Sequence, residues 1–214
     1  MSFPCDSYVP PPSLCYYRGI DVHAPREIVY RWLCQLRVAP YSYDWFDNFG
    51  RQSPRQLTAG LEQLSPEQRI FFMFRVAEFE ENEHITMVES VVENEQITMR
   101  SAFFEWIFGK VALTYLLVPC SASSCRIITK LTAHNPRTFS ARRVFFARLR
   151  RDYYPIVELP LMHKQLRTFK YLAEQQFLEE LANGRRQASV GDEQLRGNNV
   201  DSMGELVMQP PDGQ

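Results

Sequence analysis

Apolar and polar residues alternate through the middle of the chain, and this period-two pattern constrains the fold more than any other feature of the sequence. Side chains of a β-strand point alternately to opposite faces, so the pattern predicts strands with one buried face and one solvated face. Short polar stretches such as 80–83 and 121–124 separate the strands, and strands joined by such turns are antiparallel. The side chains expected on the buried face are Ile70, Phe72, Phe74, Val76, Ile85, Met87, Ile97, Met99, Phe103, Val111, Leu113, Tyr115, Leu117, Cys125, Ile127 and Leu131.

Helical patterns flank the predicted strands. A first strand over 16–22 is followed by Pro25, which suits the first turn of a helix, and then by an apolar stripe that reaches Leu36. The longest helical stripe runs over 160–183, and Gly184 fits its end. This order predicts an α+β protein, with the long C-terminal helix available to cover the concave face of a curved antiparallel β-sheet.

The length of 214 residues allows one domain with tails. Residues 1–14 contain four prolines and are interpreted as an irregular leader, with a single domain over 15–183. Residues 184–214 contain no aromatic residue and are rich in Gly, Asn, Gln and Asp. Such a segment buries too little apolar surface to offset its ordering entropy, so we expect a disordered tail.

Several function classes are disfavoured by composition. Only four of the 9 glycines precede residue 184, and none forms a phosphate-binding motif of the Rossmann or P-loop type. The net charge of −1 argues against a nucleic-acid partner. The 4 histidines are well separated and no hydrolase motif is present, so we expect neither a metal nor a cofactor.

Cysteine usage indicates a cytoplasmic protein. The five cysteines are Cys5, Cys15, Cys34, Cys120 and Cys125, an odd number without a C-x-x-C pair, and no signal-peptide pattern is evident. Free thiols in a reducing compartment fit this usage best. Cys120 and Cys125 flank an expected turn and could face each other, so their redox state stays open.

Three stretches of the chain carry a family likeness. Residues 19–25 (GIDVHAP), 39–51 (APYSYDWFDNFGR) and 161–166 (LMHKQL) resemble the SRPBCC superfamily of START-like, polyketide cyclase/dehydrase-like helix-grip proteins, in particular its uncharacterised bacterial members. The likeness covers roughly residues 17–178. The resemblance implies a helix-grip fold, in which a curved antiparallel β-sheet is wrapped around the long C-terminal helix. It also implies a cavity between them that takes a hydrophobic small molecule or lipid. Two departures are a long stretch over 92–110 and an acidic cluster over 78–95.

The inward aromatic and methionine side chains are ordinary core by pattern alone, and the resemblance makes them candidate ligand contacts. The residues expected to bind the ligand are Tyr41, Tyr43, Trp45, Phe72, Phe74, Met87, Met99, Phe103, Tyr115, Met162 and Leu166.

Catalysis is a second interpretation of the same region. A desolvated Asp44 beside Tyr41 or Tyr43 could move protons in a polyketide cyclase or dehydratase, with His163 as a further candidate. The structural alternatives are that Asp44 or Asp47 caps a short helix, that Trp45 plugs one end of the sheet, and that His163 lies at the surface. We favour these alternatives, and with them a binding protein over an enzyme.

A basic segment over 137–151 adds a third interpretation. Arg142, Arg143 and Arg148 lie there without any acidic neighbour, and a basic amphipathic helix can lie on an anionic membrane. Membrane-surface lipid transfer is therefore kept as an alternative, although a solvated face or a pairing with the acidic cluster explains the charges equally well. The pattern leaves the choice between a monomer and a homodimer open.

Overall fold

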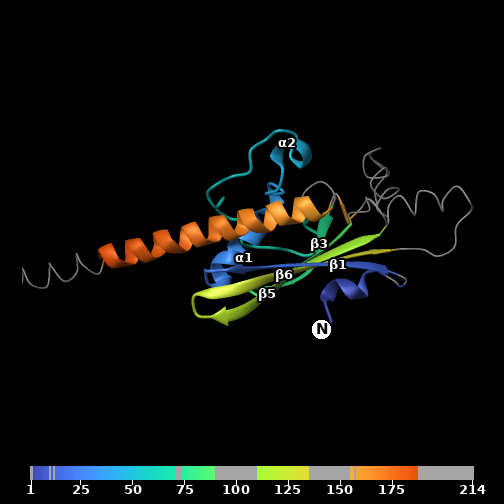
Figure 1. The fold of residues 1–214 in the computed structure, drawn as a ribbon, viewed down its shortest axis with the longest axis horizontal. Coiled ribbons are helices and arrows are strands. Elements are labelled where there is room, and N and C mark those ends of the chain that lie inside the picture. Colours follow the sequence, from blue (N-terminus) through green and yellow to red (C-terminus); the bar gives the residue numbers. More distant parts are fainter. Residues whose placement is uncertain are drawn as a thin grey trace, which may run out of the picture. The chain divides into compact units, whose positions relative to one another are not determined.

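The computed structural model describes residues 2–9, 11, 13–70, 74–89, 110–134, 155–156 and 158–187. The chain divides into two compact units, Met1–Glu174 and Gln175–Gln214, and the sheet lies within the first. In chain order the elements are the 3-10 helix η1 (Pro4–Ser7), β1 (Ser13–Val22), α1 (Arg26–Cys34), the 3-10 helix η2 (Gln35–Arg37), α2 (Asp44–Asp47), β2 (Arg69–Ile70), β3 (Phe74–Glu80), β4 (His84–Glu89), β5 (Val111–Ser121), β6 (Ser124–His134) and a C-terminal helix over 158–187 (Figure 1).

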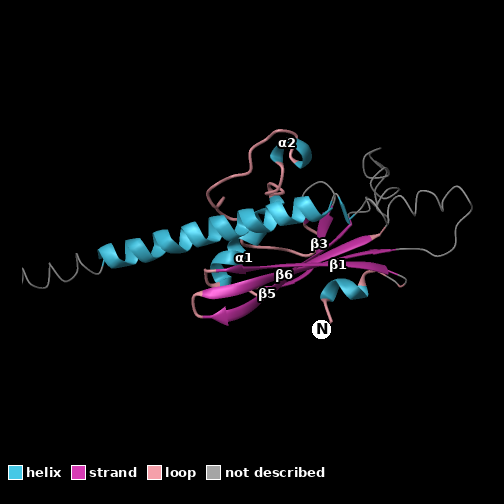
Figure 2. Ribbon diagram, viewed as in Figure 1, coloured by secondary structure: helices cyan, strands magenta, loops and turns pink. Residues whose placement is uncertain are grey.

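Six strands form one antiparallel sheet in the order β1-β6-β5-β4-β3-β2 (Figure 2). The pairing register shifts between Val76 and Glu78 and again between Pro119 and Ser121, and such irregularities bend strands. With the long helix after the sheet, the chain has the predicted α+β helix-grip fold. The prediction is confirmed.

The sheet has an inner face, toward the C-terminal helix, and an outer face. Register aligns Val76, Met87, Leu113 and Leu131 in one row of the inner face. The alternation in the sequence therefore assigned the faces correctly for the described strands, because apolar side chains at every second position have to share one face. Phe72, Ile97, Met99 and Phe103 lie outside the described residues.

Helix α1 begins directly after Pro25, whose fixed φ suits a helix start. Its buried side chains include Ile28, Val29, Trp32 and Leu33. The predicted apolar stripe continues through η2, where Leu36 is also buried. The expected helix is thus present, with a tighter last turn.

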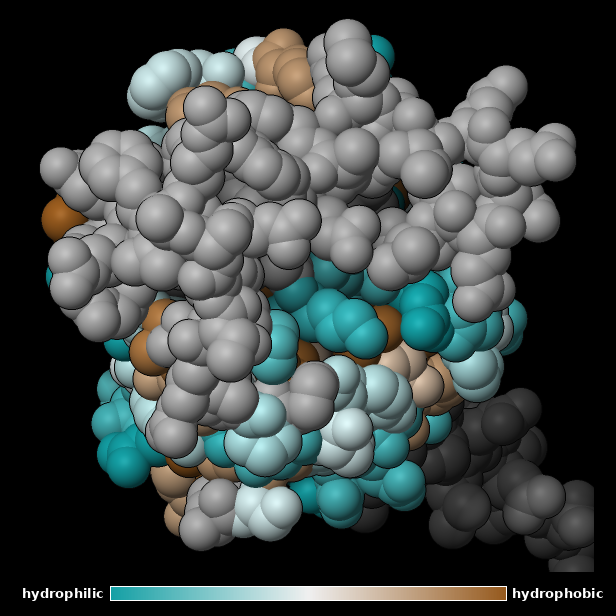
Figure 3. Space-filling view, turned by 90° about the vertical axis from the view of Figure 1, so that its right-hand side faces the viewer, coloured by the Kyte–Doolittle hydropathy of each residue, from teal (hydrophilic) through white to brown (hydrophobic). Residues whose placement is uncertain are grey.

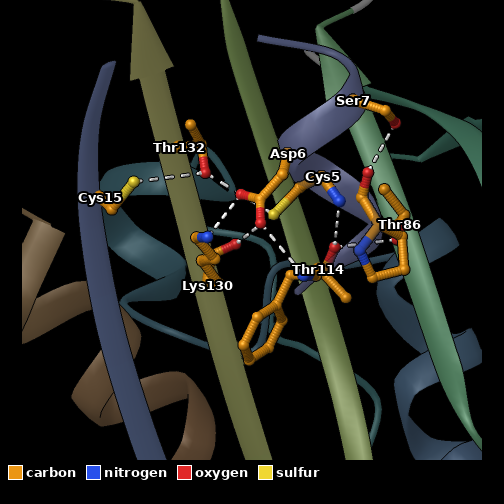
Figure 4. A network of polar contacts seen from close by, with 10 residues as sticks. Cys5, Asp6, Ser7, Cys15, Thr86, Thr114, Lys130 and Thr132 are labelled. Carbon is orange, nitrogen blue, oxygen red and sulfur yellow. Dashed lines mark hydrogen bonds and ion pairs between the residues drawn. The ribbon is translucent and has the colours of Figure 1, made fainter. Parts of the chain in front are cut away.

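The N-terminal segment differs from the expected irregular leader. Phe3, Cys5 and Val9 are 4%, 0% and 3% exposed and pack with Val88 and Ala112 on the outer face. The backbone N–H of Cys5 donates to Thr114 Oγ1 at 3.1 Å (Figure 4). The outer face is therefore covered where it was expected to be solvated, because three apolar side chains of the N-terminal segment gain burial there.

A buried lysine fixes the same segment. Lys130 Nζ lies 2.5 Å from Asp6 Oδ1 and stands over the rings of Phe3 and Tyr17, 5.4 and 5.2 Å from their centroids. Its side chain is only 7% exposed, so the ion pair and the two cation–π contacts replace the water that the ammonium group loses.

The C-terminal helix buries Met162, Leu166, Phe169 and Ala173, which belong to the predicted apolar stripe. The helix continues to residue 187, three residues beyond the stop expected at Gly184. The rest of the predicted tail lies outside the described residues. In the parts of the chain that the structure describes, no helix is long and apolar enough to cross a bilayer.

Candidate functional site

The inner face of the sheet meets the C-terminal helix through a buried hydrogen-bonded chain. The hydroxyl of Tyr115, on β5, donates to Gln165 Oε1 on the helix, and Gln165 Nε2 donates to the backbone oxygen of Pro40 at 2.6 Å. Burial raises the pKa of Tyr115, the negative charge of Glu158 adds to this effect, and the Gln165 bond opposes it. Tyr115 therefore stays a neutral hydrogen-bond donor that ties the sheet to the helix.

Tyr41 is the residue after Pro40, and it is 1% exposed. Its ring lies against Phe169 and Trp32, with centroids 5.3 and 6.2 Å away. Its backbone has φ of 56°, a left-handed conformation that is strained for a residue with a bulky side chain. Burial raises the pKa of Tyr41 to about 12, with Arg55 opposing the rise and Asp44 adding to it.

Two polar hydrogens are buried here without a partner. Neither the hydroxyl of Tyr41 nor Nε1 of Trp32 has a hydrogen-bond partner among the described residues, although both atoms are inaccessible to solvent. Leaving a buried donor unsatisfied costs about 1–3 kcal/mol. Two such donors, on rings that touch each other, form a site that the described residues leave unsatisfied.

A charged pair lies in the same interface. Arg18 is in register with Thr129, and Thr129 with Tyr115, so all three lie in one row of the inner face. Arg18 Nη2 is 2.6 Å from Glu158 Oε2 on the C-terminal helix, and Glu158 is 6% exposed. Burial raises the pKa of Glu158 and outweighs the opposing effect of Arg18.

Sequence reasoning did not single out Arg18 or Glu158. A signal was present for one of them, because Arg18 stands between Tyr16 and Ile20 at the positions that the alternation turns inward. An arginine at an inward position needs a buried acceptor, which Glu158 supplies.

Apolar side chains complete the interface. Met87 on the sheet is buried, as are Met162 and Leu166 on the helix. These expected ligand contacts lie in the interface together with Tyr115 and Tyr41. Phe74 is on the inner face and half-buried. Phe72, Met99 and Phe103 lie outside the described residues.

The remaining site candidates lie elsewhere. Asp44 accepts hydrogen bonds from the backbone N–H and the hydroxyl of Ser53, at 2.9 and 2.5 Å. Tyr43 is 38% exposed and Trp45 is 75% exposed, so Trp45 does not plug the end of the sheet as expected. The reason is the orientation of α2, whose carboxylates point toward Ser42 and Ser53 and leave the rings outside.

The catalytic candidates Tyr41 and His163 differ in burial. His163 is exposed on the C-terminal helix, whereas Tyr41 is buried.

Cys120 is exposed and Cys125 is buried, and both are free thiols. Among the described residues, no cluster of three or more His, Cys, Asp or Glu side chains could hold a metal ion. Arg142, Arg143 and Arg148 lie outside the described residues.

No protein-family model matches the chain, and no curated protein matches it significantly. Solved structures do align with it. A protein from Thermobifida fusca, solved by NMR, is 12% identical and aligns over 75% of this chain and 93% of its own, with a TM-score of 0.43. Truncated norcoclaurine synthase from Thalictrum flavum is 10% identical over 75% of this chain and 92% of its own, with a TM-score of 0.42.

The di-domain ARO/CYC StfQ from the steffimycin biosynthetic pathway is 11% identical, with a TM-score of 0.43. The alignment covers 77% of this chain and 51% of StfQ, so this chain spans about half the length of that protein. These likenesses concern the fold, and the ligands and reactions of those proteins are not carried over to this chain.

Proposed function

We propose that the protein binds an apolar small molecule between the inner face of its sheet and its C-terminal helix. The observation that carries the proposal is the pair of buried donors, Tyr41 Oη and Trp32 Nε1, without a partner among the described residues. Buried polar groups in native proteins are nearly always hydrogen-bonded, so two donors that the described residues leave unsatisfied favour a bound molecule with an acceptor atom.

The surroundings define the chemistry of that molecule. Met87, Met162 and Leu166 supply apolar contacts, and Tyr115 and Gln165 already satisfy each other. A ligand that suits this interface has an apolar body and one or two acceptor oxygens, such as a ketone, ether or phenol oxygen. Sites of this kind combine apolar walls with a few polar anchors.

The enzyme interpretation has less support. The carboxylate of Asp44 already accepts two hydrogen bonds from Ser53, and His163 is exposed on the helix. We therefore propose no acid–base role for them. Contact of the basic 137–151 segment with a membrane stays a prediction, as does the choice between a monomer and a homodimer.

Two environment-sensitive dyes of similar size test the proposal. Prodan carries a ketone acceptor on a naphthalene ring, whereas N-phenyl-1-naphthylamine carries no carbonyl. We expect both dyes to bind the protein with blue-shifted emission. Tyr41→Phe removes one donor and should weaken the binding of Prodan about fivefold to tenfold while leaving the carbonyl-free dye unchanged.

Tyr171→Phe is the matched control, because Tyr171 is 57% exposed on the C-terminal helix and loses the same atom. Unchanged affinity of the Tyr41→Phe protein for Prodan would contradict the proposal, as would failure of both dyes to bind the natural chain. Native mass spectrometry of protein purified from its host would then identify the molecule that the cell supplies.

A further inference from the structure

Helix α2 has its polar side inward and its aromatic side outward. Asp44 accepts hydrogen bonds from Ser53, and Asp47 accepts one from the hydroxyl of Ser42. Trp45 and Phe46, between these acids, are 75% and 57% exposed. This is the reverse of an ordinary surface helix, whose apolar side faces the core.

Phe49 extends the exposed side with an exposed fraction of 63%. The rings of Trp45 and Phe46 contact each other edge to face, with their centroids 5.6 Å apart, so they form one patch. We call Trp45, Phe46 and Phe49 the aromatic surface. In Figure 3 a light-brown hydrophobic group lies at the upper edge of the view, and in Figure 1, seen from a direction 90° away about the vertical axis, α2 is also near the top. Adjacent exposed aromatic side chains mark an interaction site more often than isolated ones do.

The charges beside the aromatic surface are basic. Arg51 and Arg55 follow α2 and are exposed, whereas the carboxylates of Asp44 and Asp47 are half-buried and bonded to serines. The segment therefore offers solvent three large rings and two guanidinium groups. Aromatic side chains with neighbouring basic residues are typical of proteins that lie at an anionic bilayer surface.

We propose that the aromatic surface docks on an anionic lipid bilayer. Trp45, Phe46 and Phe49 enter the headgroup boundary, where aromatic rings partition well, and Arg51 and Arg55 contact lipid phosphates. A second copy of the chain is a poorer occupant, because symmetric pairing through this surface would bring the arginines of both copies together. The inference stands on residues 44–55 and does not depend on the buried donors.

Vesicle binding tests the proposal directly. The full chain is mixed with vesicles of phosphatidylcholine alone or of phosphatidylcholine with phosphatidylglycerol, and the bound fraction is measured by co-sedimentation. We expect binding to the anionic vesicles that decreases with added salt. Acyl chains brominated near the headgroup should quench part of the tryptophan fluorescence, and this part should be missing in Trp45→Phe.

Two variants separate the contributions. Trp45→Ala/Phe46→Ala should weaken binding at least tenfold, roughly the loss of two buried aromatic contacts. Arg51→Gln/Arg55→Gln should weaken binding to anionic vesicles by about fivefold for each charge. The same variant should leave binding to pure phosphatidylcholine vesicles unchanged. Tyr171→Ala, which removes another exposed aromatic ring, is the control and should bind like the natural chain.

Three results overturn the proposal. The first is no association with anionic vesicles at low salt, and the second is full binding by Trp45→Ala/Phe46→Ala. The third is concentration-dependent self-association in sedimentation velocity that this double variant abolishes, since a second copy would then occupy the surface. None of these results bears on Prodan binding, so the interior ligand site is tested separately.

Discussion

Removing the hydroxyl of Tyr115 tests whether the buried chain from the sheet to Pro40 stabilises the fold. In Tyr115→Phe, Gln165 Oε1 loses its donor, while Gln165 Nε2 keeps its bond to the backbone oxygen of Pro40. Gln165 is 8% exposed, so water cannot easily replace the lost hydroxyl. The loss of the bond and the unsatisfied acceptor together predict a decrease of about 2 kcal/mol in the free energy of unfolding.

Urea unfolding measures this decrease. With a urea slope of about 2 kcal/mol per molar, the midpoint should fall by about 1 M while the slope stays constant. Tyr171→Phe loses the same atom at an exposed position and should change the free energy by less than about 0.5 kcal/mol. A decrease in Tyr115→Phe no larger than in this control would refute the reasoning.

A double-mutant cycle sharpens the test. Gln165→Leu should be more damaging than Tyr115→Phe, because it deprives both the Tyr115 hydroxyl and the Pro40 oxygen of a partner. In the double variant the Tyr115 hydroxyl is no longer present to be left unsatisfied. The double variant should therefore be about 1–2 kcal/mol more stable than the sum of the two single losses predicts. Strict additivity would show that the two side chains are not coupled.

Two further predictions concern the outer face and the thiols. Burial opposes the charged form of Asp6, but the bonds to Lys130 and Phe3 outweigh it and hold the pKa of Asp6 below its ordinary 3.8. The ionised carboxylate of Asp6 therefore stabilises the folded protein above pH 3.8, and this contribution is lost as the pH falls through the lower pKa of the folded state. In Asp6→Asn this part of the decrease in stability at acid pH should be missing, which urea unfolding at a series of pH values measures. Burial also raises the pKa of Cys34 to about 12 and that of Cys125 to about 11, and Cys5 is buried as well. Ellman's reagent should therefore modify only the exposed Cys15 and Cys120 before the protein unfolds. A third thiol that reacts rapidly would contradict the structure.

The sheet could be predicted from the sequence because a single physical rule governs it. An apolar side chain at every second position has to share one face, which assigned Leu113, Tyr115 and Ile127 to the inner face without knowledge of the partners. The cover on the outer face was missed, although a signal existed. Ala112 and Thr114 alternate with the inward residues, and small uncharged side chains leave room for a segment such as the one around Cys5.

The site was predictable only in part. The aromatic content of 39–51 pointed to the segment that supplies the buried Tyr41, but the sequence does not show which rings turn inward. Hydrogen bonds from Ser42 and Ser53 to the acids of α2 decide this, and they leave Trp45 outside. Ser53 lies nine residues after Asp44, in a loop, where no periodic pattern links the two residues.

Removing the unsatisfied hydroxyl of Tyr41 should have opposite effects on the stability of the protein and on its affinity for a ligand. The left-handed backbone costs about 1–3 kcal/mol in any residue with a side chain, so it is unchanged in Tyr41→Phe. The buried hydroxyl, however, is lost in that variant, and the ligand-free protein should become about 1 kcal/mol more stable while Prodan binds more weakly. Thermal unfolding in the absence of dye measures the first effect, and a fluorescence titration measures the second. If Tyr41→Phe is instead less stable than the natural chain, the hydroxyl has a partner within the protein, and Tyr41 is part of the core rather than of a ligand site.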